Sequence, residues 1–258
     1  MKGISEIFST IVLTSTVIII SIIVAFYAMV HLQYSLASTE YGYAKSTVVS
    51  IANNFHSILQ GNTFLARVPM SRVGIGYERN SDLKLEIYVN NTLVYNDTEL
   101  YNLTVTIYYP LISIPQVVYG NSSGNVKYCS FIVRDVRLIP CIVEKYQNGA
   151  TMLKMDTARF YVVAYKITTD TTVKYLARIY YVRTVPIVKG SSGTITVQAH
   201  KDILEQVYYN VNDATLKLTD TSLGVTLQDI SLRSYLGLSP TDQLDVVVIV
   251  KEVYVVIM

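Results

Sequence analysis

The hydrophobic pattern opens with an uninterrupted apolar run close to the first residue. Residues 11–30 read IVLTSTVIIISIIVAFYAMV and include no charged side chain. Twenty such positions make a helix long enough to cross the hydrocarbon core of a bilayer, and a helix satisfies its own backbone hydrogen bonds without water. The run therefore predicts a helix that lies in a membrane or in equally apolar packing.

A removed secretory signal is the alternative to a retained helix. Such a signal has an apolar stretch of about 7–15 residues and then a small-residue cleavage site. Here the stretch continues to Val30, and the small pair Ala37-Ser38 lies well beyond it, so we favour a retained anchor. Lys2 is followed by no Lys or Arg until Lys45. Because positive charge stays on the cytoplasmic side, we expect the N-terminus in the cytoplasm and the following domain outside.

The helical pattern continues past the apolar run but becomes one-sided. Residues 32–60 contain no proline and one glycine, and apolar residues from Val48 to Leu59 recur at spacings of three and four. This stripe is typical of a helix that packs on one face, and Gly61-Asn62 supplies a C-terminal stop. We therefore predict one helix over residues 4–60, whose second half packs on its own outer domain.

After Gly61 the apolar residues recur at every second position instead of every third or fourth. Residues 83–89 and 103–109 alternate apolar and polar positions, as half-buried strands do, and Asn90-Asn91 is typical of a turn. Sequential strands without intervening helices favour an antiparallel sandwich over a parallel sheet. The predicted class is α+β: a long N-terminal hydrophobic helix followed by a mainly antiparallel β-sandwich head over residues 62–258, with a subdivision near residues 147–150. Further strands are expected near 126–134, 139–146, 159–168, 172–183, 194–199, 215–219, 223–228 and 244–258.

Composition narrows the class of protein. The chain has 258 residues and a net charge of +2, so electrostatics give no basis for nucleic-acid binding. Only 16 % of the residues are charged, whereas there are 22 tyrosines and no tryptophan. Such a composition favours strands with a surface made polar by hydroxyl groups.

Two cysteines, Cys129 and Cys141, are present. In an exported chain they are expected to form a disulfide, here one that staples a hairpin and stabilises it by about 3 kcal/mol. Two buried free thiols are the alternative. No metal site is expected, because there is no second cysteine pair and the three histidines are far apart in sequence.

Four Asn-x-Ser/Thr sequons begin at Asn90, Asn96, Asn102 and Asn121. They cluster in one stretch and predict a glycan-bearing outer face if the host modifies exported proteins.

The first residues carry a family resemblance. Lys2-Gly3, then Ile4-Ser5-Glu6 and the apolar helix, resemble the start of an archaeal type IV pilin-like protein with a class III signal peptide. The resemblance implies that residues 1–3 are a leader removed by a prepilin peptidase at the Gly3–Ile4 bond. It further implies that the helix bundles with other subunits in a filament core, that pilus assembly machinery is a partner, and that the head decorates the outside.

Polar residues at the helix have two interpretations each. Glu6 pairs with the N-terminal amine of a neighbouring subunit in an apolar core, or it only interacts with the helix N-terminus and solvent. The hydroxyl residues inside the apolar helix bond across helices, or they bond the preceding carbonyls of their own helix.

The sequence contains few candidate motifs for catalysis or ligand binding. No nucleophile motif, phosphate loop or zinc helix appears, and the acidic residues Asp97, Glu99, Asp213 and Asp220 lack EF-hand spacing. We therefore expect no catalysis and no cofactor. The favoured function is a pilin-like subunit of a cell-surface filament, located in the cell membrane before assembly. The alternatives are a monomeric membrane-anchored surface protein and an anchored extracytoplasmic enzyme or solute-binding protein.

Overall fold

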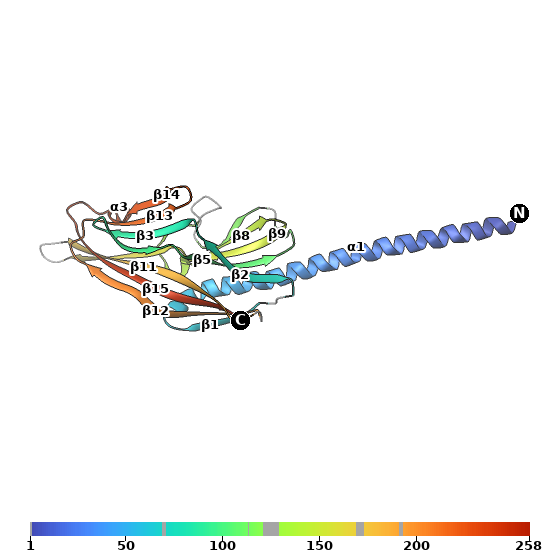
Figure 1. Ribbon diagram of the computed structural model, residues 1–258, viewed down its shortest axis with the longest axis horizontal. Coiled ribbons are helices and arrows are strands. Elements are labelled where there is room, and N and C mark those ends of the chain that lie inside the picture. Colours follow the sequence, from blue (N-terminus) through green and yellow to red (C-terminus); the bar gives the residue numbers. More distant parts are fainter. Residues whose placement is uncertain (1, 69–70, 113, 121–128, 169–172, 191–192) are drawn as a thin grey trace.

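The protein consists of one long helix and a β-rich head (Figure 1). A computed structural model describes the chain except residues 1, 69–70, 113, 121–128, 169–172 and 191–192. Helix α1 (Lys2–Asn53) has 52 residues and is about 78 Å long at 1.5 Å per residue. The predicted α+β class, with a long apolar helix before a mainly antiparallel head, is confirmed.

The predicted helix over residues 4–60 is divided near its end. Asn54 separates α1 from the short helix α2 (Phe55–Leu59), although its backbone N–H still donates to Ser50. Gly61 follows with a φ of +103°, which a residue with a side chain rarely adopts. The chain leaves the helix there because glycine permits this conformation.

In the described part of the chain, three sheets build the head. A six-stranded sheet has the order β1 (Thr63–Arg67), β12 (Thr194–Tyr208), β15 (Gln243–Ile257), β11 (Val173–Val188), β10 (Phe160–Thr168), β7 (Ile132–Val133). A four-stranded sheet has the order β14 (Val225–Ser231), β13 (Ala214–Asp220), β3 (Leu83–Val89), β4 (Thr92–Asp97). A five-stranded sheet has the order β2 (Val73–Asn80), β5 (Leu100–Ile107), β9 (Ala150–Asp156), β8 (Cys141–Gln147), β6 (Gln116–Tyr119). The short helices η1 (Val136–Leu138) and α3 (Leu232–Leu236) connect strands.

The last strand lies in the middle of the largest sheet. β15 pairs antiparallel with β12 and parallel with β11. A second parallel pair joins β7 to β10. These two parallel pairs join strands that are distant in sequence, and the head remains mainly antiparallel, as predicted.

Two hydrophobic cores use opposite faces of the six-stranded sheet. Alternate residues of β15 from Leu244 to Val250 lie in the distal core, under the four-stranded sheet. Val253, Val255 and Ile257 lie in the proximal core, with the end of α1 and the five-stranded sheet. Since side chains alternate between the faces of a strand, the even and odd positions of β15 serve different cores.

The sequence pattern is interrupted near residues 147–150, where a subdivision is predicted, and again at the glycine- and serine-rich residues 189–193, and both interruptions connect strands of the head. Asn148 and Gly149 have positive φ values and form the turn of the hairpin between β8 and β9. The break at residues 189–193 connects β11 to β12, apart from residues 191–192, which lie outside the description. The two cores thus meet across the six-stranded sheet and not at either break.

Local patterns predicted several strands well. Residues 83–89 form β3, and Asn90 and Asn91, with φ values of 49° and 62°, turn the chain into β4. β12 is much longer than the predicted 194–199. Of the strand expected near residues 126–134, the structure shows the two-residue strand β7. Residues 126–128 lie outside the described part of the chain.

The predicted disulfide between Cys129 and Cys141 is present, with 6.4 Å between the two Cα atoms. The sequence predicted that this disulfide would staple a hairpin, and that part of the prediction is wrong. The enclosed segment holds β7, which belongs to the six-stranded sheet, and Cys141 starts β8 of the five-stranded sheet. The bond therefore restrains the passage between two sheets.

Candidate functional site

The first half of α1 carries an exposed apolar surface. From Phe8 to Leu36 its large apolar side chains are between 41 % and 71 % exposed, and the sequence has no Asp, Glu, Lys or Arg over residues 8–39. Within the described residues, α1 is the one helix long and apolar enough to span a membrane. By length and composition it fits a membrane anchor or a signal sequence.

Three hydroxyl groups inside this apolar segment bond to carbonyls of their own helix. Each donates to the carbonyl four residues earlier, at 2.7–2.8 Å: Thr14 to Thr10, Thr16 to Val12 and Ser21 to Val17. In the single chain these groups therefore follow the second of the two interpretations given above.

The residues that carry the family resemblance lie at the start of this helix. Gly3, Ile4 and Glu6 belong to the first turns of α1. Their side chains fall outside the described part of the chain, so leader cleavage and the role of Glu6 stay predictions.

The second half of α1 packs into the head. One stripe of α1 and α2 is buried in the proximal core, at positions Ala37, Tyr41, Ala44, Val48, Ile51, Ala52, Phe55 and Ile58. This stripe contains the predicted one, except that Leu59 is only partly buried, and it begins three turns earlier. Alanines at two of its first three positions allow the helix to approach the sheets closely.

A buried carboxylate joins this stripe to the head. Glu144 on β8 is 1 % exposed. Tyr41 donates its hydroxyl to Glu144 at 2.6 Å and Lys45 donates its Nζ at 2.9 Å, while Gln116 on β6 is a third donor. The three donors come from α1 and the five-stranded sheet, so Glu144 fixes the helix against the end of that sheet.

Electrostatics keep Glu144 ionised at neutral pH. Burial raises its pKa, but the hydrogen bonds from Tyr41, Gln116 and Lys45 lower it, and the net pKa lies below the usual range of a glutamate. The pKa of the Tyr41 hydroxyl is raised, first by burial and then by the neighbouring carboxylate. Tyr41 therefore stays protonated and remains a donor.

A second polar contact lies next to Tyr41 on the helix. Glu40 accepts hydrogen bonds from Ser71 and from Arg72, the latter at 3.3 Å. Because Glu40 and Lys45 contact different segments of the head, these contacts fix both the rotation and the position of α1.

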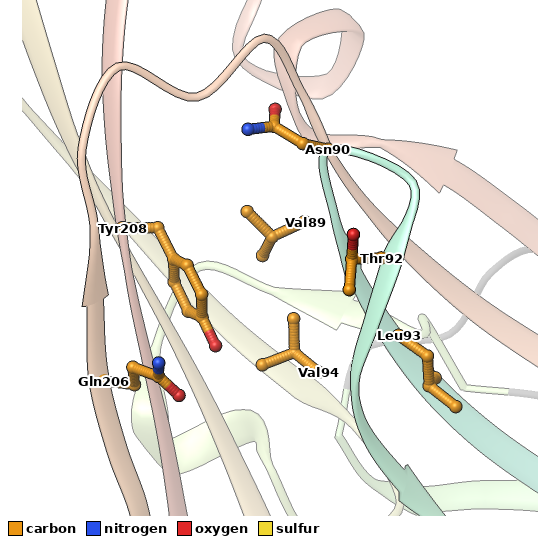
Figure 2. Close-up of a pocket in the computed structure, with 7 residues that line it drawn as sticks. All are labelled: Val89, Asn90, Thr92, Leu93, Val94, Gln206 and Tyr208. Carbon is orange, nitrogen blue, oxygen red and sulfur yellow. The ribbon is translucent and has the colours of Figure 1, made fainter.

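A groove opens in the distal part of the head, between β4 and β12 (Figure 2). Its volume is about 450 Å³, and it is lined by Val89, Asn90, Thr92, Leu93, Val94, Gln206 and Tyr208. Tyr208 is the one ionisable side chain in this lining. The groove thus lacks the convergent acids and bases that an active site requires.

Histidines and acidic residues form no metal centre in the described part of the chain, where no group of three potential ligands comes together. His31 contacts the ring of Tyr27, and His200 stacks on Tyr254 with 4.3 Å between ring centroids. His56 lies 3.0 Å from the amide of Gln60.

The sequons have different environments. Asn90 and Asn96 are exposed, the first in the turn between β3 and β4 and the second near the end of β4. Asn102 on β5 is 1 % exposed, and its amide faces Asn80, Lys154 and Asp156. In this fold the buried position of Asn102 opposes a glycan there, and glycosylation of the sequons stays a prediction. Asn121 lies outside the described residues.

Comparisons with protein families, curated proteins and solved structures give no match. The candidate site is therefore the one defined by the chain's own geometry. It comprises the exposed apolar half of α1 and the polar junction that holds the other half to the head.

Proposed function

We propose that this protein is a type IV pilin-like subunit of a cell-surface filament, with a structural and adhesive role. One observation carries the proposal: an uncharged apolar helix segment, exposed along its length, projects from a folded head (Figure 1). Apolar surface gains about 25 cal/mol for each Å² removed from water. Packing such helices side by side supplies the cohesion of a filament.

The extent of the exposed segment favours bundling over simple anchoring. Residues 8–36 span about 43 Å as a helix, whereas the hydrocarbon core of a bilayer is about 30 Å thick. Leu32, Tyr34 and Leu36 lie at the outer end and are all exposed. Neighbouring helices would cover these side chains, which a membrane covers only if the helix tilts.

The junction suits a subunit that transmits force. Glu144 and Glu40 hold α1 to the head through buried and half-buried polar contacts. Load on the head would therefore pass directly to the helix bundle. In this proposal prepilin peptidase cuts at Gly3–Ile4, and Glu6 pairs with the new amine of a neighbouring subunit, as favoured in an apolar setting.

The test is the native N-terminus, measured by mass spectrometry, together with electron microscopy of sheared surface material. We expect a mature chain that begins at Ile4 and filaments that contain it. Gly3→Val should block cleavage and abolish filaments. Gly42→Val is the matched control, because Gly42 lies exposed on α1 with open space around it.

Two results would contradict the proposal. An intact Met1 in membranes without filaments would indicate the monomeric anchored protein, an alternative that the internally bonded hydroxyls of α1 also favour. A mature chain in the medium that begins near Ser38 would show that the helix is an export signal.

A further inference from the structure

One face of the six-stranded sheet is left open in its distal half. Alternate residues of β15 from Leu244 to Val250 lie in the distal core, so the residues between them point to the opposite side of the sheet. On that side the proximal core includes β15 only from Val253 onward. The open face consists of the outward-pointing residues in four segments that pair side by side: 161–167 of β10, 174–180 of β11, 243–249 of β15 and 205–207 of β12.

One row of residues across the open face is mainly aromatic and apolar. It consists of Tyr161, Tyr180, Ile249 and Glu205, and the ring centroids of the two tyrosines lie 5.5 Å apart. Tyr180 and Ile249 are partly exposed and belong to neither core. In the described part of the chain, no second layer therefore covers their apolar surface.

The adjacent row has the same character. It consists of Val163, Arg178, Val247 and Val207. Val207 is 43 % exposed, and the guanidinium of Arg178 lies 5.7 Å from the centroid of the Tyr165 ring. Single apolar residues are normal on a protein surface, whereas a contiguous apolar patch marks an interaction site.

The outer faces of the other two sheets are different. On the four-stranded sheet Lys84 and Glu86 form an ion pair at 2.7 Å, and on the five-stranded sheet Lys154 pairs with Glu78 at 3.3 Å. A sheet with one solvated face normally carries polar residues on that face. The open face departs from this rule, which indicates that a partner covers it.

The charges on the open face indicate which partner fits. Arg178 and Glu205 are exposed, and neither forms an ion pair within the described residues, whereas Lys174 and Asp245 on the same face pair at 2.7 Å. Arg178 and Glu205 lie on opposite sides of β15, on β11 and β12. The open face therefore carries one unpaired charge of each sign, which a second open face complements.

We propose that the open face binds the open face of a second copy of this chain about a two-fold axis. The axis runs midway between Arg178 and Glu205, across β15 between Val247 and Ile249. Each Arg178 then lies opposite Glu205 of the other copy, because residues exchange places across an isologous contact. Tyrosine and arginine, which this face presents, are enriched at protein interfaces. The inference goes beyond the proposed function and does not depend on filament formation.

The size of the open face predicts a weak contact. Four strands about 4.8 Å apart and four rows about 6.8 Å apart give about 500 Å² on each copy. A total of about 1,000 Å² is at the low end for protein interfaces. The pair should therefore dissociate on dilution, and its detection requires chemical trapping.

Cross-linking of the full-length protein in detergent micelles tests the contact. Val207→Cys places one thiol beside the proposed axis, and a bifunctional thiol reagent that spans about 10 Å joins two copies, since stacked sheets lie about 10 Å apart. Leu65→Cys is the matched control, because Leu65 is 65 % exposed on the opposite face of the same sheet. The native cysteines are paired with each other and do not react. We expect about tenfold more covalent dimer from Val207→Cys, because only that site lies in a contact that buries apolar area.

Charge reversal identifies the two-fold pairing. Arg178→Glu or Glu205→Arg, each combined with Val207→Cys, should lower the dimer yield about tenfold, since like charges across an interface cost several kcal/mol. An equal mixture of these two variants recreates both opposite-charge contacts and should restore the yield. Lys166→Glu is the control and should leave the yield unchanged, because Lys166 is exposed and points to the other side of β10.

Three results would overturn the inference. Equal dimer yields from Val207→Cys and Leu65→Cys would show that no second copy covers the open face, and would leave it to a partner of another kind, such as a glycan. Yields that do not fall on charge reversal, or that fall and are not restored in the mixture, would show that Arg178 and Glu205 do not pair between copies. Because the protein is dispersed in micelles, these results are independent of whether filaments form.

Discussion

At the scale of single residues, Glu144 is the side chain on which the helix junction depends. Its carboxylate accepts hydrogen bonds from Tyr41, Lys45 and Gln116. Nothing in the local sequence around Glu144 indicates this role, because Tyr41 is 103 positions away. A glutamate in a strand is usually solvent-exposed, and only the approach of α1 buries this one.

Glu144 should make stability depend on acid pH. Its folded pKa lies below the unfolded value, so its contribution is complete above the unfolded pKa of about 4.3 and is lost as pH falls through the folded pKa. Glu144→Gln should lower the free energy of unfolding at pH 7 by about 1–3 kcal/mol, since Lys45 and Tyr41 lose a charged acceptor. Glu144→Gln should also make the free energy of unfolding fall less steeply below pH 4.

Denaturant unfolding at pH 3 to 7 measures both effects. Asp229→Asn is the control, because Asp229 is exposed and its contact with Lys217 is 3.4 Å long; such pairs contribute about 0–1 kcal/mol. An unchanged acid slope in Glu144→Gln would show that the junction carboxylate does not control acid stability.

At the scale of elements, β15 is the central strand of the head. It lies between β12 and β11 and contributes to both cores. The strand predicted at residues 244–258 therefore belongs to the centre of its own chain's largest sheet.

Two substitutions in β15 should separate its faces. Val248 is fully buried in the distal core, whereas Ile249 lies half-buried on the opposite face. Val248→Ala should cost about 2 kcal/mol of unfolding free energy. Ile249→Ala removes more atoms but should cost less, because they are partly hydrated already. Equal or inverted losses in thermal unfolding would contradict the assignment of the two faces.

At the scale of the whole molecule, α1 is both a projecting rod and part of the head. Its first half is exposed, while its second half fills the proximal core between two sheets. Removal of the first half should therefore remove most of the exposed apolar surface without disturbing the fold.

Two truncations test this division. Residues 32–258, produced under oxidising conditions, should be soluble, folded and monomeric by size-exclusion chromatography and circular dichroism. Residues 61–258 should aggregate, because the proximal core loses the buried stripe from Ala37 to Ile58. A folded, soluble 61–258 fragment would show that the head does not need the helix.

The sequence by itself determined the features that depend on neighbouring residues. The apolar helix followed from residues 11–30, β3 from the alternation over 83–89, and the turn after it from Asn90-Asn91. Helical and strand periods act over a few residues, so these elements are visible in the chain alone. The pairing of Cys129 with Cys141 followed because no other cysteine is present.

Only the tertiary structure decided which distant residues meet. The parallel pairing of β11 with β15 joins segments about 70 positions apart, and the contact between Glu144 and Tyr41 spans more. Asn102 carries the same sequon as Asn96, yet neighbouring strands bury it. Burial and long-range pairing depend on how completed elements pack, and no local pattern records that packing.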